Sequence, residues 1–170
     1  MDKLCRIAVD AAINAGASYA DARFVSRREE SVETKNGSVD GVTSSTDRGI
    51  GVRVIAGGAW GFAATSELTE SALADAARKA VEIGKAGAPT LEEPVTLSCL
   101  DPVTDHVPHT AKQDPFEVPL AKRVELLLDC DRRMAEAADV VLRQGLLLIS
   151  RQEQLFVSSE GSEIYQERIE

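Results

Sequence analysis

The segment that most constrains the fold runs from Gly49 to Ala86, where a strand–turn–strand pattern leads directly into an amphipathic helix. Apolar residues recur at every second position on both sides of the Gly57-Gly58 turn, which is the spacing of a β-hairpin. They are Ile50, Val52 and Val54 before the turn and Trp60, Phe62 and Ala64 after it. The next segment predicts a helix with one apolar stripe, formed by Leu73, Ala76, Ala77, Ala80, Val81 and Gly84. We therefore expect this helix to pack flat on the hairpin.

Two helices flank the predicted strands. The first is expected over residues 2–15, and Gly16 supplies the left-handed residue that commonly ends a helix. The second is the Ala-rich helix over residues 69–86, with Thr69 as candidate N-cap and with Gly87 and Pro89 beyond its end. Both helices could lie on one face of the sheet, which leaves the other face free.

The strands between these helices are marked by alternation and by turn residues. Two antiparallel strands are expected at Asp21–Arg28 and Ser31–Asn36, separated by two glutamates, with a turn at Asn36-Gly37. Ser38–Thr46 is a weaker, polar strand or a wide loop. Together with the hairpin, these segments predict an antiparallel sheet of four to five strands. The fold class is therefore α+β, with a two-layer N-terminal domain over residues 1–88.

The remaining sequence predicts a linker and part of a second domain. Residues 89–118 form a Pro-rich linker or extended crossover, since five of the six prolines gather there. Residues 119–170 predict an incomplete unit of one helix, ending near residue 138, and three strands. The apolar positions of this helix are Leu120, Val124, Leu127, Leu128, Met134 and Ala138. The strands are expected at Val140–Ser150, Gln154–Ser158 and Ser162–Ile169.

Unpaired strands in this second unit predict self-association or the addition of a strand from a partner. Val140–Ile149 is apolar on both alternating faces, and a strand of that kind expects cover on both sides. Ser162–Ile169 is expected to be an edge strand, with Ile164 and Tyr165 available for contact with a peptide or partner. A substrate peptide held by strand addition is one form of that contact.

The order of these segments resembles the N-terminal part of the TldD/PmbA family, bacterial and archaeal metallopeptidases once labelled modulators of DNA gyrase. The resemblance is carried by D-A-R-F at residues 21–24, E-x-V-E-T-K-N-G at 30–37, R-G-I-G-V-R-V at 48–54 and G-G-x-x-G-F-A at 57–63. The helix after residue 118 resembles the one that opens the family's second region. The resemblance implies partnership with a homologous TldD-like or PmbA-like subunit, an oligomer, and unfolded peptides as substrates.

Family members that cleave peptides carry zinc on a helix with the motif H-E-x-x-x-H, which this sequence does not contain. Its histidines are His106 and His109, and neither is followed by a glutamate. No catalytic, cofactor or metal residue can therefore be carried over, and this chain alone is expected to be inactive. The resemblance places zinc in a C-terminal part of the family protein that these 170 residues do not include.

Other residues with functional potential have simpler explanations. His106-x-x-His109 lies in a proline-flanked loop, and Asp101, Asp105 and Asp114 lack the spacing of a calcium loop, so we assign no metal to this chain. The glycines around the hairpin lack the ending of a phosphate loop and fit turns and close packing. Trp60 is either an exposed anchor for a peptide or partner or, as we favour, half-buried against the Ala-rich helix.

Composition narrows the partners and the location. The formal net charge is −9, without clustered Lys and Arg, which disfavours direct nucleic-acid binding. The three cysteines, Cys5, Cys99 and Cys130, are far apart, and Cys5 and Cys130 fit core positions in helices of a protein from a reducing compartment. No stretch has the length and apolarity of a signal peptide or a membrane span, so a cytoplasmic location is expected.

Two functions stay open. The first is the non-catalytic N-terminal region of a TldD/PmbA-like metallopeptidase, which shapes substrate access and subunit contacts in the proteolysis or processing of unfolded peptides. The second is a stand-alone protein-binding or scaffold module with the same fold and no peptidase role. An in-frame H-E-x-x-x-H motif downstream of codon 170 would distinguish the first from the second.

Overall fold

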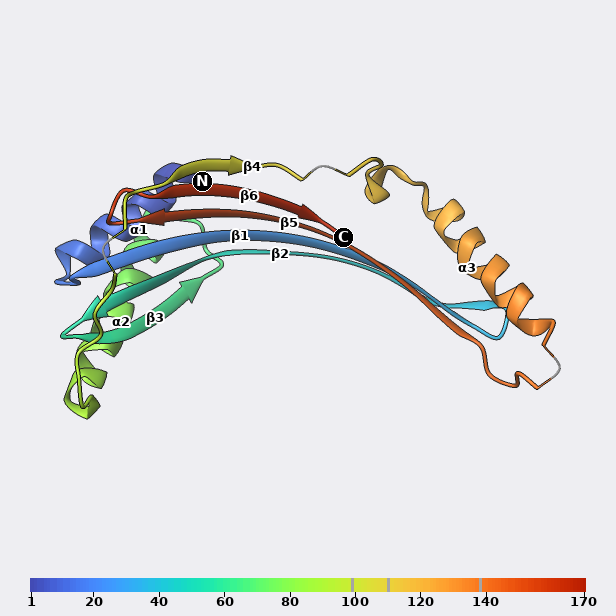
Figure 1. The fold of residues 1–170 in the computed structure, drawn as a ribbon, viewed down its shortest axis with the longest axis horizontal. Coiled ribbons are helices and arrows are strands. Elements are labelled where there is room, and N and C mark those ends of the chain that lie inside the picture. The colour runs from blue at the N-terminus through green and yellow to red at the C-terminus, as the bar shows by residue number, and fades with distance from the viewer. Residues whose placement is uncertain (99, 110, 138) are drawn as a thin grey trace. The chain divides into compact units, whose positions relative to one another are not determined.

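The computed structural model describes residues 1–98, 100–109, 111–137 and 139–170. The fold is α+β, as the sequence predicts, and the described residues form a mixed six-stranded sheet in the order β3-β2-β1-β5-β6-β4 (Figure 1). The helices are α1 (Asp2–Asn14), α2 (Glu70–Gly87) and α3 (Leu120–Ala135), with short 3-10 helices η1 (Ala88–Thr90) and η2 (Pro115–Glu117). The strands are β1 (Tyr19–Lys35), β2 (Ser38–Ala56), β3 (Ala59–Thr65), β4 (Thr104–Val107), β5 (Gln144–Ser158) and β6 (Glu163–Ile169).

The folded chain divides into two compact units, each built from three segments. Unit 1 comprises Met1–Ser26, Arg48–Pro108 and Glu153–Glu167, and unit 2 comprises Arg27–Asp47, His109–Gln152 and Arg168–Glu170. The long strands β1, β2 and β5 contribute residues to both units. The division into domains by sequence order, at residues 1–88, 89–118 and 119–170, stays a prediction.

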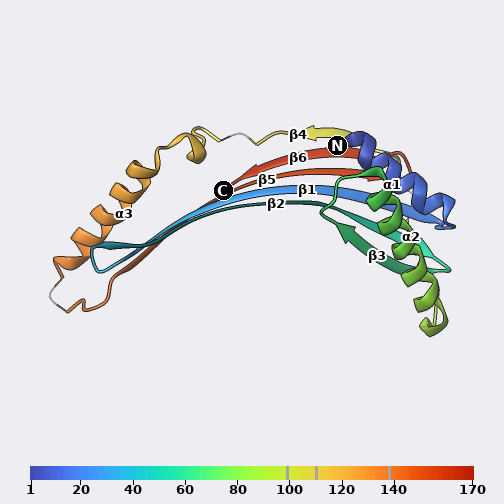
Figure 2. The ribbon, with the colours of Figure 1, turned by 180° about the vertical axis from the view of Figure 1, so that it is seen from behind.

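In unit 1, α1 and α2 lie side by side on one face of the sheet. Both helices lie behind the strands in Figure 1 and in front of them in Figure 2. Residues from both helices and from the facing strands form the core, which includes Cys5, Val52, Val54, Leu73 and Val81. All six residues of the predicted α2 stripe are buried, so the packing of this helix on the hairpin is confirmed.

The local signals at the helix ends and turns are confirmed. The Thr69 hydroxyl accepts a hydrogen bond from the backbone N–H of Ala72 at 3.3 Å, which caps α2. Gly16 follows α1 with a φ of 100°. Asn36 and Gly37, with φ of 48° and 81°, connect β1 to β2. Each of these signals depends only on neighbouring residues, because caps and turns are local structures.

Two strand boundaries predicted from charged residues were wrong. The segments Asp21–Arg28 and Ser31–Asn36 belong to one strand, β1, which continues through Glu29 and Glu30. Both carboxylates are neutralised two residues away along the strand, since Arg27 lies 2.7 Å from Glu29 and Arg28 lies 2.5 Å from Glu30. Paired in this way, the glutamates do not interrupt the strand.

The second such boundary lies in β5. The predicted strands Val140–Ser150 and Gln154–Ser158 form one strand that begins only at Gln144 and runs through the predicted turn at Arg151-Gln152-Glu153. The Arg151 side chain pairs with Asp114 and lies over the ring of Phe116, 5.4 Å from its centroid. These two contacts stabilise the Arg151 side chain within unit 2, so the strand continues through this residue.

The prediction that the last strand lies at the sheet edge was also wrong. β4 forms inside the predicted linker and pairs in parallel with β6, from Thr104 opposite Glu163 to Val107 opposite Gln166. The last strand, predicted as an edge strand, therefore lies between β5 and β4. A parallel pair between segments almost sixty residues apart leaves no local pattern in a four-residue strand.

In unit 2, the buried side of α3 carries charged residues. Arg123 and Asp131 are buried on this helix. Of the predicted apolar positions that the structure describes, only Leu127 is buried, and Ala138 lies outside the described residues. Arg123 lies 2.7 Å from Glu30 of β1, and Asp131 lies 3.1 Å from Arg143. Ion pairs with residues outside α3 thus form on the side of the helix where periodicity predicted an apolar stripe.

The cysteines are only partly as expected. Cys5 is buried in α1, as predicted for a small core residue, and burial raises the pKa of its thiol. Cys130 is exposed, so its predicted core position was wrong, because the buried side of α3 is the one that carries Arg123, Leu127 and Asp131. Cys99 lies outside the described residues.

Candidate functional site

Trp60 lies on the face of the unit 1 sheet opposite the helices. On β3, Ala59 and Gly61 are buried, whereas Trp60 and Phe62 are exposed. A Cβ added at Gly61 would overlap the carbonyl oxygen of Ala80, so this side of β3 faces α2 directly. The favoured prediction that Trp60 packs against the Ala-rich helix was therefore wrong. Successive side chains of a strand point to opposite faces, and Gly61 occupies the helix side.

Trp60 belongs to a cluster that combines aromatic rings with one buried ion pair. Its ring stands edge-on to Tyr19, with centroids 6.1 Å apart, and the Arg53 guanidinium lies 4.8 Å from its centroid. Arg53 also reaches the carboxylate of Asp21, with Nη2 2.8 Å and Nε 2.9 Å from Oδ2. Asp21 is only 3% exposed, so the ion pair with Arg53 offsets the cost of burying the carboxylate charge in the sheet.

These contacts change the titration of Tyr19 and Arg53. Partial burial, followed by the nearby Asp21 carboxylate, raises the pKa of Tyr19 to about 12. Partial burial opposes the charge on Arg53, but the hydrogen bond and charge of Asp21 outweigh it and raise the guanidinium pKa. The cluster therefore combines a charged guanidinium, paired with Asp21, with an exposed indole ring at the surface.

A shallow hollow of about 220 Å³ lies beside this cluster, lined by Asp21, Arg23, Gly51, Arg53 and Phe62. Arg23 is exposed and lies over the ring of Phe156 at 5.5 Å. Sequence reasoning had selected Trp60 but missed Asp21 and both arginines. The available signal was the alternation of Tyr19, Asp21 and Arg23 with the buried Ala20, Ala22 and Phe24 in one strand.

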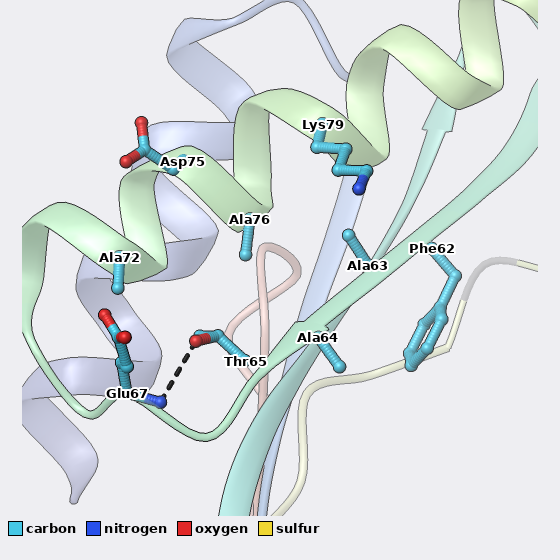
Figure 3. A pocket seen from close by; sticks show the side chains of 9 residues that line it. All are labelled: Phe62, Ala63, Ala64, Thr65, Glu67, Ala72, Asp75, Ala76 and Lys79. Carbon is cyan, nitrogen blue, oxygen red and sulfur yellow. Dashed lines mark hydrogen bonds between the residues drawn. The ribbon is translucent and has the colours of Figure 1, made fainter.

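A larger groove of about 520 Å³ lies between β3 and α2 (Figure 3). One wall is β3 from Phe62 to Thr65, and the other is the first half of α2, with Ala72, Asp75, Ala76 and Lys79. In Figure 3 the Ala76 methyl points from the helix toward the strand, and Ala63 points from the strand toward the helix beside Lys79. Alanine side chains therefore contribute to both walls, alongside larger side chains such as Phe62 and Lys79.

The groove narrows like a wedge toward Gly61, where the backbones of β3 and α2 come into contact. Near Gly61 the strand backbone meets the helix backbone, and a Cβ at that position would lie 2.7 Å from the Gly84 nitrogen. Toward Thr65 the space opens, and the loop starts where the Glu67 N–H donates to the Thr65 hydroxyl at 3.0 Å. The groove thus follows the outer side of β3, the terminal strand of the sheet.

Ile164 and Tyr165, the other predicted contact residues, lie on β6 and are half-buried. The Tyr165 ring packs against the core and contacts His106 of β4, with ring centroids 4.8 Å apart. Burial, followed by the charges of Glu153 and Glu167, raises its pKa. Three strands separate β6 from β3 in the sheet order, so the structure does not bring these residues together with Trp60.

The described residues do not form a zinc site. Within the part of the chain that the structure describes, no group of three or more His, Cys, Asp or Glu side chains could hold a metal ion. His106 is an exposed residue of β4, engaged with Tyr165. The donor set that the family's zinc requires is therefore not found among these residues, and we derive no chemical step through it.

Among the described residues, no helix combines the length and the apolarity needed to cross a membrane.

The described residues form an α+β fold with a groove between β3 and α2 and a shallow hollow beside Arg53. Comparison with known proteins agrees with this class, since residues 20–84 match the family model of PmbA/TldA metallopeptidase domain 1. A metalloprotease of Methanothermobacter thermautotrophicus is 30% identical over 145 residues, covering 85% of this chain and 30% of the relative. A metalloprotease of Methanocaldococcus jannaschii is 23% identical over 146 residues, covering 86% and 32%. The chain thus spans about a third of the length of these relatives.

Solved structures share the fold at low identity. A Bacteroides thetaiotaomicron protein described as a candidate modulator of DNA gyrase superposes with a TM-score of 0.78 at 13% identity, covering 99% of this chain and 38% of that protein. TldE from Thermococcus kodakarensis superposes with a TM-score of 0.71 at 15% identity, covering 98% and 36%. The matched first domain and the similarity to two metalloproteases support membership of the TldD/PmbA family, and the solved structures share the fold.

Proposed function

We propose that this chain is the non-catalytic N-terminal region of a TldD/PmbA-like metallopeptidase, where it shapes substrate access and subunit contacts during proteolysis or processing of unfolded peptides. The observation that carries the proposal is the match of residues 20–84 to the first domain of a metallopeptidase family. The similarity to two metalloproteases over most of this chain, but a third of their length, supports a regional role within a larger enzyme.

The proposed partners are a homologous TldD-like or PmbA-like subunit and unfolded peptide substrates, in an oligomer. The similarity to TldE supports a subunit role within a family complex. The exposed Trp60 and Phe62, with Arg23 and Arg53 beside them, offer one surface for such contacts. The net charge of −9 supports a role without direct nucleic-acid binding, and the separated cysteines support a cytoplasmic location.

Zinc, in this proposal, lies in a catalytic region outside these 170 residues. The test measures zinc in the purified chain after dialysis and its cleavage of an unfolded casein. We expect less than a tenth of an equivalent of zinc and no cleavage. Metal-dependent cleavage by the chain alone would overturn the non-catalytic role.

The coding sequence downstream of codon 170 supplies the second half of the test. With an in-frame H-E-x-x-x-H, we expect the longer protein to cleave casein, and removal of residues 1–170 to raise KM more than it lowers kcat. An unchanged KM in a folded, truncated enzyme would contradict a role in substrate access.

The alternative is a stand-alone protein-binding or scaffold module without a peptidase role. The exposed aromatic and cationic residues around Trp60 favour a binding function of some kind. A stop codon after residue 170 without the zinc motif downstream would favour this alternative.

A further inference from the structure

We propose that the groove between β3 and α2 binds an extended peptide, which adds as a strand to the outer edge of β3 and directs a carboxylate toward Lys79. This deepens the proposed function by naming where an unfolded peptide binds. It rests on that function only for its biological setting, since the groove lies wholly within unit 1 and needs no catalytic centre.

β3 forms an exposed edge of the sheet. β3 pairs with β2 on one side, from Ala56 opposite Ala59 to Ile50 opposite Thr65, and it ends the strand order on the other. A terminal strand presents backbone N–H and C=O groups that a peptide in extended conformation can pair. The wall from Phe62 to Thr65 offers about 13 Å of strand, at ~3.3 Å per residue, enough for a peptide of about four residues.

The space beside that edge has a shape that suits an extended peptide. Contact at Gly61 closes the wedge at one end, and the groove opens along Ala72 and Ala76 toward Thr65. A strand added to β3 directs alternate side chains toward the helix. Because Ala72 and Ala76 carry only methyl groups on that wall, there is room for apolar side chains at these alternate positions, whereas the others project away from α2.

Charged side chains lie at both ends of the groove. Asp75 pairs with Arg78 on the next turn of α2, so its charge is offset. Lys79, by contrast, lines the groove near its closed end and has no ion-pair partner among the described residues. Glu67 lines the opposite, open end. This polarity favours a peptide with an acidic side chain or its terminal carboxylate beside Lys79.

The test uses the chain of residues 1–170 and a fluorescein-labelled hexapeptide of alternating valine and alanine that ends in aspartate. Fluorescence anisotropy gives its dissociation constant. A second probe carries N-methyl groups on alternate amides, in two versions that cover both registers. We expect saturable binding of the plain peptide and at least tenfold weaker binding of one N-methylated version but not the other. Equal binding of all three would overturn strand addition.

Two variants locate the site. Ala72→Tyr fills the groove, and we expect it to weaken binding at least tenfold, whereas Ser71→Tyr on the exposed side of the same helix has little effect. Lys79→Glu is expected to weaken binding at least fivefold, and Lys35→Glu, with the same change of charge in unit 2, is the control. Circular dichroism melts verify that each variant is folded.

The outcomes separate this inference from the proposed function. Absence of peptide binding to the folded chain, or binding lost in Trp60→Ala but kept in both groove variants, would overturn the groove assignment. Cleavage of casein by the longer protein would still support the proposed function in that case. Peptide binding without any cleavage by the longer protein would keep the groove and overturn the peptidase role.

Discussion

Arg53 of β2 reaches across the sheet to the buried carboxylate of Asp21 on β1, with two guanidinium nitrogens 2.8 and 2.9 Å from one carboxylate oxygen. The same guanidinium lies over the exposed ring of Trp60. One arginine thus neutralises a buried acid and holds an indole at the surface. The helix-free face of unit 1 is therefore organised by charge, whereas the opposite face is organised by apolar packing.

Titration of Tyr19 tests this arrangement. Its pKa is raised to about 12 by burial and then by Asp21, against an ordinary value of 10. A raised pKa stabilises the fold fully below pH 10, and this contribution is lost as pH rises from 10 through 12. Absorbance at 295 nm should show tyrosine ionisation above pH 10 in the folded chain, and Asp21→Asn should shift one step to lower pH. A titration unchanged by Asp21→Asn and Tyr19→Phe would contradict the assignment.

Gly61 should tolerate no side chain. Gly61→Ala places a methyl group against the Ala80 carbonyl and the Gly84 nitrogen, both backbone atoms that can move only with α2. We expect the free energy of unfolding in urea to fall by about 3 kcal/mol. Gly41→Ala is the matched control on β2, because nothing lies within 4 Å of a Cβ at that position. Equal stability of the two variants would show that α2 does not contact β3 closely.

Val52 should tolerate no charge. Its side chain is fully buried beneath the helices, so Val52→Asp buries an unpaired carboxylate and should cost more than about 4 kcal/mol, enough to unfold the domain. Val42→Asp, at an exposed position of the same strand β2, should change the melting temperature little. A soluble Val52→Asp variant with an unchanged melting curve would show that the face assignment is wrong.

The elements predicted correctly are those whose signals are local. The stripe from Leu73 to Gly84 contains every residue that determines its period, and Thr69 and Gly16 mark helix ends through their own chemistry. Periodicity also showed that Trp60 and Gly61 point to opposite faces of β3. It did not show which of these faces α2 covers, although a glycine beside an Ala-rich helix is a sign of close packing.

The elements missed depend on partners far away in the sequence. Glu30 was predicted to lie at a strand boundary. Its carboxylate instead pairs with Arg28 and with Arg123, which lies 93 residues later, so the strand continues. β4 forms only because β6 is available to pair with it. The groove likewise requires that Ala76 of α2 lie opposite β3, which neither segment specifies by itself. Local patterns predict elements, whereas surfaces formed by several elements need the folded chain.

The Glu30–Arg123 pair should make the stability of unit 2 depend on pH. The Arg123 hydrogen bond holds the pKa of Glu30 below its ordinary value of 4.5. A lowered pKa stabilises the folded state fully above pH 4.5, and this contribution is lost as pH falls through the folded pKa. Glu30→Gln should therefore flatten the fall in stability below pH 4.5, and Arg123→Met should cost about 2 kcal/mol at pH 7.

Hydrogen exchange of the amides in α3 is the measurement for this pair, because it reports on unit 2 directly. Lys122→Met, next to Arg123 but exposed and paired with Glu125 on the same helix, is the control and should leave exchange unchanged. Equal exchange in the Arg123 and Lys122 variants would mean that the ion pair does not hold α3 in place.

Exposed leucines on β5 predict that the isolated chain associates with itself. Leu146 and Leu148 point to the same side of the strand and are 64% and 53% exposed. The sequence predicted cover on both faces here, but among the described residues this face is open, and exposed apolar surface of this kind drives association.

Sedimentation at tens of micromolar should show dimers or larger species, and Leu146→Lys with Leu148→Lys should give a monomer with the same circular dichroism spectrum. Lys substitution at the exposed Val39 of β2 is the control. A strictly monomeric unmodified chain, with rapid amide exchange throughout residues 140–169, would show that this region is disordered and forms no interface.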